Sequence, residues 1–169
     1  PLYLRSLDSG IATKNYADAN QLLESIKGYQ IKYASDIIPS DEKIDAEILY
    51  NKYDIFRNLF LYYFLAGLLF FIFIILNIFS ENKLIHKIMK YIFIIFRSSI
   101  VILFIAHTLG LIARWYISGH APWGDAYESM IYVAWATMGI GLLFIKKSDL
   151  TLASTSFVTS MILMIAHWN

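Results

Sequence analysis

Residues 114–130 are the part of the chain whose side chains could do chemistry. In one-letter code the segment reads RWYISGHAPWGDAYESM, and it lies between two long apolar runs. An arginine can hold a carboxylate through two parallel hydrogen bonds, and tryptophan and tyrosine offer flat faces to an aromatic ligand. A helix that faces lipid needs none of these groups. The segment therefore predicts a short loop at a membrane interface that holds a flat, charged ligand.

Five residues of this segment and one histidine before it are the candidate ligand-binding residues. They are Arg114, Trp115, His120, Trp123, Glu128 and His107. Gly119 and Pro122 flank His120, and such residues favour a turn, which would point the imidazole toward the membrane surface. The loop is thus expected to gather a cation, two indoles, an imidazole and a carboxylate.

Each of the loop candidates also has an ordinary structural interpretation. An arginine at a helix end extends its charge toward water, and tryptophans collect at membrane interfaces. Glu128 falls in the first turn of an expected helix, where a negative charge is stabilised by the helix dipole. The dense combination of these residues, more than any one of them, favours ligand binding.

The histidines differ in their surroundings. His107 lies inside an apolar run, where an ionisable group is costly and suggests a function, and seven residues before Arg114, on the same helix face. A hydrogen bond from His107 to a neighbouring helix is the alternative. His86 lies among lysines and is expected in solvent. His167 precedes Trp168 near the end of an apolar run and suits either an interfacial anchor or a ligand contact.

Several kinds of chemistry are excluded or unsupported. The chain has no cysteine, so it can have neither disulfides nor thiolate metal sites. Its net charge of +1 argues against a nucleic-acid partner. Neither a Ser/His/Asp arrangement nor a pair of carboxylates in a credible cleft can be defended. We therefore predict no catalytic residue, and no metal ligand can be assigned.

Apolar composition predicts an all-α, multi-pass membrane protein. The 169 residues are 58% apolar and 17% aromatic, and the charged residues concentrate before residue 58. Runs of about 18 or more apolar residues are candidate transmembrane helices. Four segments fit, at about 59–79, 91–115, 127–145 and 150–168. We expect residues 58–169 to form the transmembrane region, with a short extracytoplasmic helical segment at 1–57.

Lysines in the connections predict the orientation. Lys83, Lys87 and Lys90 follow the first expected span, and Lys146 and Lys147 follow the third. Both connections lie on one side if there are four spans, and positive charge marks the cytoplasmic side. Residues 1–57 and the loop 116–127 are then expected on the outer, periplasmic side of the cytoplasmic (inner) membrane.

The front segment reads as a helical hairpin. Apolar residues at spacings of three and four predict a helix over Thr13–Ala34. Ser40 can cap a second helix that runs from Asp41 to about Arg57, close to or into the first span. The chain begins at Pro1 without an initiator methionine, so we expect an internal piece of a longer polypeptide, with this segment as the end of a larger domain.

The loop motif resembles a known family. Arg114–Trp123, followed by Tyr127-Glu128-Ser129 and the span to Trp135, resembles the early membrane region of CcsA/ResC proteins, which act in System II cytochrome c biogenesis. Residues around Tyr50-Asn51-Lys52 and Ile55-Phe56 resemble the segment that precedes the CcsA-like part of fused CcsBA-type proteins. Ile165–Trp168 resembles the end of a family span. The resemblance covers most of residues 40–169.

This resemblance implies a function. Such proteins export haem b and attach it to apocytochrome c, as holocytochrome c synthases. It implies haem, apocytochrome c, the lipid membrane and the remaining CcsB and CcsA portions as partners. The family presents haem on a tryptophan-rich site of the form WGxxWxWD, of which only Trp123-Gly124-Asp125 is matched here. The family's axial histidines lie further along the polypeptide and are not carried over to His107, His120 or His167. The loop is thus expected to support or border the haem site.

Two other functions remain open on the sequence. The chain could form a transporter or channel for another ligand, with His107 and Arg97 lining its path. It could also be a structural membrane subunit whose polar loop contacts a partner protein.

Overall fold

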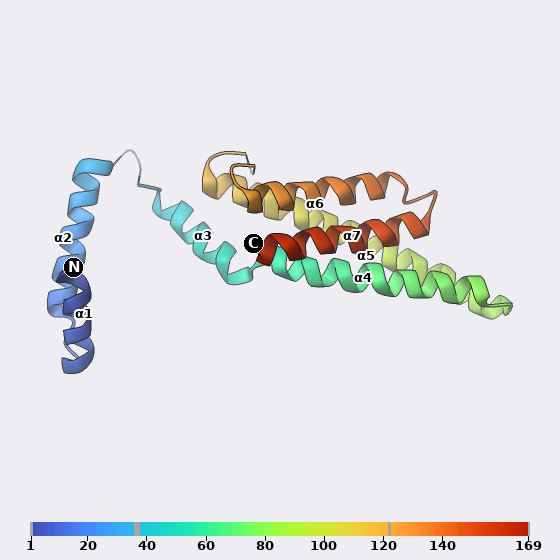
Figure 1. Cartoon of the computed structure of the whole chain (residues 1–169), viewed down its shortest axis with the longest axis horizontal. Coiled ribbons are helices and arrows are strands. Elements are labelled where there is room, and N and C mark those ends of the chain that lie inside the picture. The colour runs from blue at the N-terminus through green and yellow to red at the C-terminus, as the bar shows by residue number, and fades with distance from the viewer. Residues whose placement is uncertain (1, 36–37, 122, 169) are drawn as a thin grey trace. The chain divides into compact units, whose positions relative to one another are not determined.

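Helices account for most of the chain in the computed structural model, which describes residues 2–35, 38–121 and 123–168. Within those residues there is no strand, so the all-α prediction is confirmed. The helices are α1 (Leu2–Thr13), α2 (Ala17–Ala34), α3 (Asp41–Tyr53), α4 (Ile55–Phe79), α5 (Lys83–Ser118), α6 (Ala126–Leu143) and α7 (Asp149–Trp168) (Figure 1). Pro122, part of the expected turn, lies outside the described residues.

Two compact units divide the chain, Pro1–Glu42 and Lys43–Asn169. In the first, α1 packs against α2. The turn between them includes Lys14 in a left-handed conformation, with φ of 55°, and the Asn15 side chain accepts a hydrogen bond from the Ala17 N–H at 3.1 Å. The predicted helix therefore begins at Ala17 instead of Thr13, because this turn separates α2 from α1. The periodicity of apolar residues did not reveal the turn.

The second unit contains a bundle of four helices, α4 to α7 (Figure 1). Helix α7 packs between α4 and α6, and α5 contacts both α4 and α6. The expected helix from Asp41 to Arg57 is interrupted at Asp54, which has φ of 41°, so α3 ends at Tyr53 and α4 begins at Ile55. The α4–α5 and α6–α7 connections lie at one end of the bundle, and the α5–α6 loop lies at the other (Figure 1).

Hydroxyl groups of α7 join it to both neighbours. The Ser156 hydroxyl donates to the Tyr63 carbonyl of α4 at 2.9 Å, and the Thr159 hydroxyl donates to the Ala134 carbonyl of α6 at 3.5 Å. Both side chains are fully buried. Small and hydroxylated residues allow close approach and hydrogen bonding between helices in lipid. These contacts explain why a Ser- and Thr-rich segment is an interior helix.

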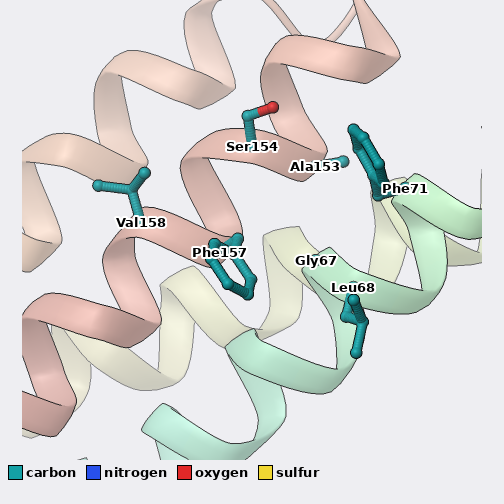
Figure 2. A pocket seen from close by; sticks show the side chains of 7 residues that line it. All are labelled: Gly67, Leu68, Phe71, Ala153, Ser154, Phe157 and Val158. Carbon is teal, nitrogen blue, oxygen red and sulfur yellow. The ribbon is translucent and has the colours of Figure 1, made fainter.

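Gly67 is a point of close approach between α4 and α7. A Cβ atom there would lie 2.8 Å from the Phe157 backbone nitrogen and 2.9 Å from the Ala153 carbonyl oxygen. Beside this contact is an apolar hollow of about 300 Å³. Figure 2 shows the side chains of Leu68 and Phe71 from α4 and of Phe157 from α7 around it. Only glycine allows the two backbones to pack this closely.

Three helical segments are long and apolar enough to cross a membrane, Asp41–Phe79, Lys83–Ser118 and Asp149–Trp168. They contain the first, second and fourth expected spans. The third corresponds to α6, an 18-residue helix that packs against α7 but is not among the three. Eighteen residues at about 1.5 Å each fall a little short of a hydrocarbon core about 30 Å thick. The polar first turn of α6, which contains Glu128, also lowers the mean hydropathy of the helix. The fold is that of a multi-pass membrane protein.

Candidate functional site

The end of α5 and the start of α6 hold the loop of the candidate site. Gly119 ends α5 with φ of 75°, and its N–H donates to the Trp115 carbonyl at 2.9 Å. Asp125 caps α6, because its carboxylate accepts a hydrogen bond from the Glu128 N–H at 2.7 Å. Both helix ends are thus closed by local hydrogen bonds, which position the loop between them.

Glu128 is the centre of this loop. Its side chain is buried, and Oε1 accepts a hydrogen bond from Arg114 Nε at 3.0 Å while Oε2 accepts one from the Gly124 N–H at 2.9 Å. A buried carboxylate is costly unless it is paired and hydrogen-bonded. The Arg114–Glu128 pair therefore ties the last turn of α5 to the first turn of α6, and Gly124 joins the loop to the same carboxylate.

His120 packs against this pair from the solvent side. Its side chain is 59% exposed, and Nδ1 lies 3.0 Å from the Ala121 carbonyl and 3.9 Å from Glu128 Oε2. A Cβ atom on Gly124 would lie 2.9 Å from the His120 ring and 3.2 Å from Glu128 Oε2, so the absence of a side chain at Gly124 lets both groups approach the loop backbone. The structure thus brings five of the six candidates to this end of the bundle: Arg114, Trp115, His120, Trp123 and Glu128.

Trp115 and Trp123 line an open groove between α5 and α6. Their side chains are 56% and 62% exposed, and the groove has a volume of about 430 Å³. We name it the α5–α6 groove, and its lining residues are Thr108, Leu111, Ile112, Trp115, Ala121, Trp123, Tyr132 and Trp135. Its wall is aromatic and aliphatic, which suits a flat apolar ligand.

Of the residues that line the groove, the sequence singled out Trp115 and Trp123 as ligand contacts but not the other six. Tyr132 and Trp135 lie one turn apart on α6, and the Trp135 indole N–H donates to the Thr108 hydroxyl of α5 at 2.9 Å. The spacing of Tyr132 and Trp135 places them on one helix face and was the available signal. That this face meets α5, beside Trp123, required the tertiary structure.

His107 lies in the bundle interior. It is fully buried, its Nε2 is 3.1 Å from the Ile131 carbonyl of α6, and Nδ1 has no hydrogen-bond partner among the described residues. Its ring packs edge-on against Phe56, with centroids 5.4 Å apart, and lies 6.0 Å from the Tyr63 ring. The hydrogen bond to a neighbouring helix, one of its two sequence interpretations, is present.

The other polar candidates lie elsewhere. Arg97 donates two hydrogen bonds to Asp149, at 2.7 and 2.8 Å, and so joins α5 to the start of α7. His86 lies 2.8 Å from the Asn77 side chain near the α4–α5 connection, and His167 is exposed at the end of α7. Over residues 2–35, 38–121 and 123–168, no cluster of three or more His, Asp or Glu side chains could hold a metal ion.

Comparison with known proteins identifies relatives of the chain. No family model matches it. Protein NrfI of Wolinella succinogenes is 35% identical over 161 residues, which are 95% of this chain and 17% of NrfI. Cytochrome c biogenesis protein CcsA of Lotus japonicus is 44% identical over 39 residues, which are 23% of this chain and 12% of that protein. The chain thus spans less than a fifth of the length of either relative. By these matches, and as its motifs predicted, the chain is related to the CcsA-type proteins.

Proposed function

We propose that this chain is part of a haem-handling membrane protein that exports haem and attaches it to apocytochrome c. The observation that carries the proposal is the loop braced by Arg114 and Glu128 beside an aromatic groove, in a chain similar to a cytochrome c biogenesis protein. Haem is a flat, largely apolar ring with carboxylate substituents. A membrane-embedded aromatic wall next to a polar loop matches both parts of that chemistry.

The candidate residues divide into two roles. Trp115 and Trp123 expose indole faces and would contact the ring, with His120 as a polar neighbour at the mouth of the loop. Arg114 and Glu128 satisfy each other, so they would hold the loop in place. His107 would support the bundle interior through Ile131. The axial ligands of haem, and its transfer to apocytochrome c, would require the remaining CcsB and CcsA portions.

The proposed orientation follows from the ends of the bundle. Lys83, Lys87 and Lys90 lie on the first turns of α5, and Lys146 and Lys147 lie in the α6–α7 connection. The start of α5 and the α6–α7 connection share one end of the bundle, and the α5–α6 loop lies at the other (Figure 1). The positive-inside rule then favours a cytoplasmic location for the lysines. The candidate loop and residues 1–57 would face the outer side of the cytoplasmic membrane, where apocytochrome c would be available, with residues 58–169 as the transmembrane region.

The proposal is tested with Arg114→Gln and Trp123→Leu in the complete protein. We expect each variant to lower both the haem that co-purifies with the protein and the yield of holocytochrome c. Arg57→Gln and Trp168→Leu are the matched controls, because both side chains are exposed and lie outside the loop. Unchanged haem content and unchanged holocytochrome c in both loop variants would refute a role of this loop in haem handling.

A further inference from the structure

Two polar atoms on neighbouring rings in the bundle interior have no hydrogen-bond partner among the described residues. They are the Tyr63 hydroxyl on α4 and His107 Nδ1 on α5, and both side chains are fully buried. The ring centroids are 6.0 Å apart, with an interplanar angle of 55°. Buried polar groups in native proteins are almost always hydrogen-bonded, and the hydrocarbon core of a membrane has no bulk water to satisfy them. Two such atoms on adjacent rings therefore point to a small ligand that contacts both.

The hydrogen bond on the other side of the imidazole determines what His107 Nδ1 can do. Nε2 lies 3.1 Å from the Ile131 carbonyl oxygen, which can only accept, so Nε2 carries the ring proton. A second proton on this ring would place a charge in the apolar interior, which is costly. The ring is therefore neutral, and Nδ1 is a hydrogen-bond acceptor.

Tyr63 supplies the complementary donor. A phenol hydroxyl donates one hydrogen bond and can also accept. The Tyr63 backbone is held in place from α7, because the Ser156 hydroxyl donates to the Tyr63 carbonyl at 2.9 Å. A donor on α4 and an acceptor on α5 thus belong to neighbouring rings, although no direct hydrogen bond joins them. A molecule that both accepts and donates would satisfy the two atoms at once.

Phe56 separates these two rings from the polar end of the bundle. Its side chain is 3% exposed and packs edge-on against the His107 ring, with centroids 5.4 Å apart, and against the Tyr127 ring at 6.4 Å. Tyr127 lies in the first turn of α6, next to the loop. The apolar Phe56 side chain therefore closes the interior on that side. A ligand between Tyr63 and His107 must be small, and it would exchange slowly with bulk solvent.

We propose that the bundle interior binds one water molecule between Tyr63 and His107, which accepts from the Tyr63 hydroxyl and donates to His107 Nδ1. The water joins α4 to α5, and the hydrogen bond from Nε2 to Ile131 continues the chain to α6. Buried waters of this kind satisfy polar groups that have no other partner and are costly to remove. The inference is independent of the function proposed for the loop, because neither side chain belongs to the loop.

The test uses the complete protein in lipid bilayers, with isotope-labelled histidine and solid-state NMR. His107→Gln identifies the His107 signals by their loss. In the unaltered protein we expect a neutral ring with its proton on Nε2, an Nδ1 resonance typical of a hydrogen-bonded acceptor, and a cross-peak from Nδ1 to a water proton.

Tyr63→Phe removes the donor and keeps the ring. We expect it to shift the Nδ1 resonance and to weaken the water cross-peak, because the water loses one of its two partners. Tyr62→Phe is the matched control, since Tyr62 is the preceding residue of α4 but is 56% exposed. The control should leave both signals as they are in the unaltered protein.

Exchange into heavy-oxygen water distinguishes a water bridge from a direct bond between the two rings. Infrared difference spectra should show an O–H stretching band that shifts after long exchange in the unaltered protein and in Tyr62→Phe. The same band should be lost or displaced in Tyr63→Phe.

Three results would overturn the water site. One is an Nδ1 resonance that responds to Tyr63→Phe without any band sensitive to heavy oxygen, which would indicate a direct Tyr63–His107 hydrogen bond. The others are an Nδ1 that accepts no hydrogen bond, and a ring proton on Nδ1. The cross-peak and the tautomer are read from the unaltered protein, so these results decide the proposal even if Tyr63→Phe does not fold.

Discussion

At the scale of single residues, the structure gives Glu128 a role that the sequence did not predict. The sequence offers it as a ligand contact or as a charge that favours a helix start. In the structure it is a buried carboxylate that accepts hydrogen bonds from Arg114 and from the Gly124 N–H, with His120 close by. Such a group is stable only because its partners are in place, so its contribution is to hold the loop together.

The substitution Glu128→Gln tests this role. Glutamine keeps the size of the side chain but leaves the partly buried Arg114 without its counter-charge, and we expect a loss of about 1–3 kcal/mol in the free energy of unfolding. Thermal unfolding in detergent, followed by tryptophan fluorescence, measures the change. The matched control is Glu24→Gln, which removes the exposed pair with Lys27 at 3.2 Å and should alter stability by less than about 0.5 kcal/mol. Equal unfolding temperatures for the two variants would contradict the role given to Glu128.

At the scale of elements, α7 depends on close contacts with its two neighbours. Ser156 and Thr159 reach carbonyls of α4 and α6, and Gly67 lets the α4 backbone touch α7. Three of the hydroxyl side chains that lower the hydropathy of this segment, Ser156, Thr159 and Ser160, are buried in the bundle, whereas Ser154 is exposed. In lipid there is no hydrophobic driving force for helices to associate, because the lipid tails are as apolar as the side chains. Close packing and hydrogen bonds between helices must therefore stabilise the bundle.

Gly67→Ala is expected to destabilise the α4–α7 contact. The added methyl would lie within 3 Å of two backbone atoms of α7, which cannot move aside as a flexible side chain would. Overpacking of this kind costs about 1–3 kcal/mol. Gly139→Ala is the matched control, since a Cβ there would meet only Phe104 ring atoms at 3.6 Å or more, and a helical alanine gains about 0.5–1 kcal/mol. Denaturation by a graded detergent series compares the two, and a Gly67→Ala protein as stable as Gly139→Ala would show that the helices are not in close contact.

At the scale of the whole molecule, the bundle separates two chemically different ends. The lysines on the first turns of α5 and in the α6–α7 connection lie at one end, and the α5–α6 loop, flanked by Arg114 and Glu128, lies at the other (Figure 1). The Arg97–Asp149 pair joins α5 and α7 across 52 positions of sequence. This polarity supports the proposed orientation, in which the candidate haem surface would face the outer side.

Single cysteines test this orientation, because the chain contains no cysteine of its own. Lys87→Cys and Lys147→Cys should react with a membrane-impermeant maleimide only when the cytoplasmic side is opened. Tyr116→Cys should react from the outside in intact cells. Retained holocytochrome c yield would show that each variant is folded. Labelling of all three from the same side would contradict the arrangement of α5 across the membrane.

Sequence alone predicted the features that depend on composition along the chain. Long apolar runs require helices in lipid, because every backbone N–H and C=O must be satisfied within its own segment. This is why the sequence predicted three helices that are long and apolar enough to cross a membrane, and the loop after the second of them. The family resemblance followed from a motif that is contiguous in sequence. Local exceptions were missed: the turn at Lys14 and the break at Asp54 depend on a single backbone conformation each, and composition does not encode them strongly.

Only the tertiary structure decided which residues act together. The pairing of Arg114 with Glu128, the hydrogen bond of His107 to Ile131 and the placement of Trp135 beside Thr108 all join different helices. Such contacts are set by how helices rotate and pack about one another, and periodicity within one helix leaves that rotation open. The sequence determined that this protein consists of membrane helices with a loop rich in aromatic and charged residues. The packing of α5 against α6 decided that Arg114 and Glu128 pair with each other and hold the loop in place. It also decided that the aromatic face of α6 lines the groove beside the loop.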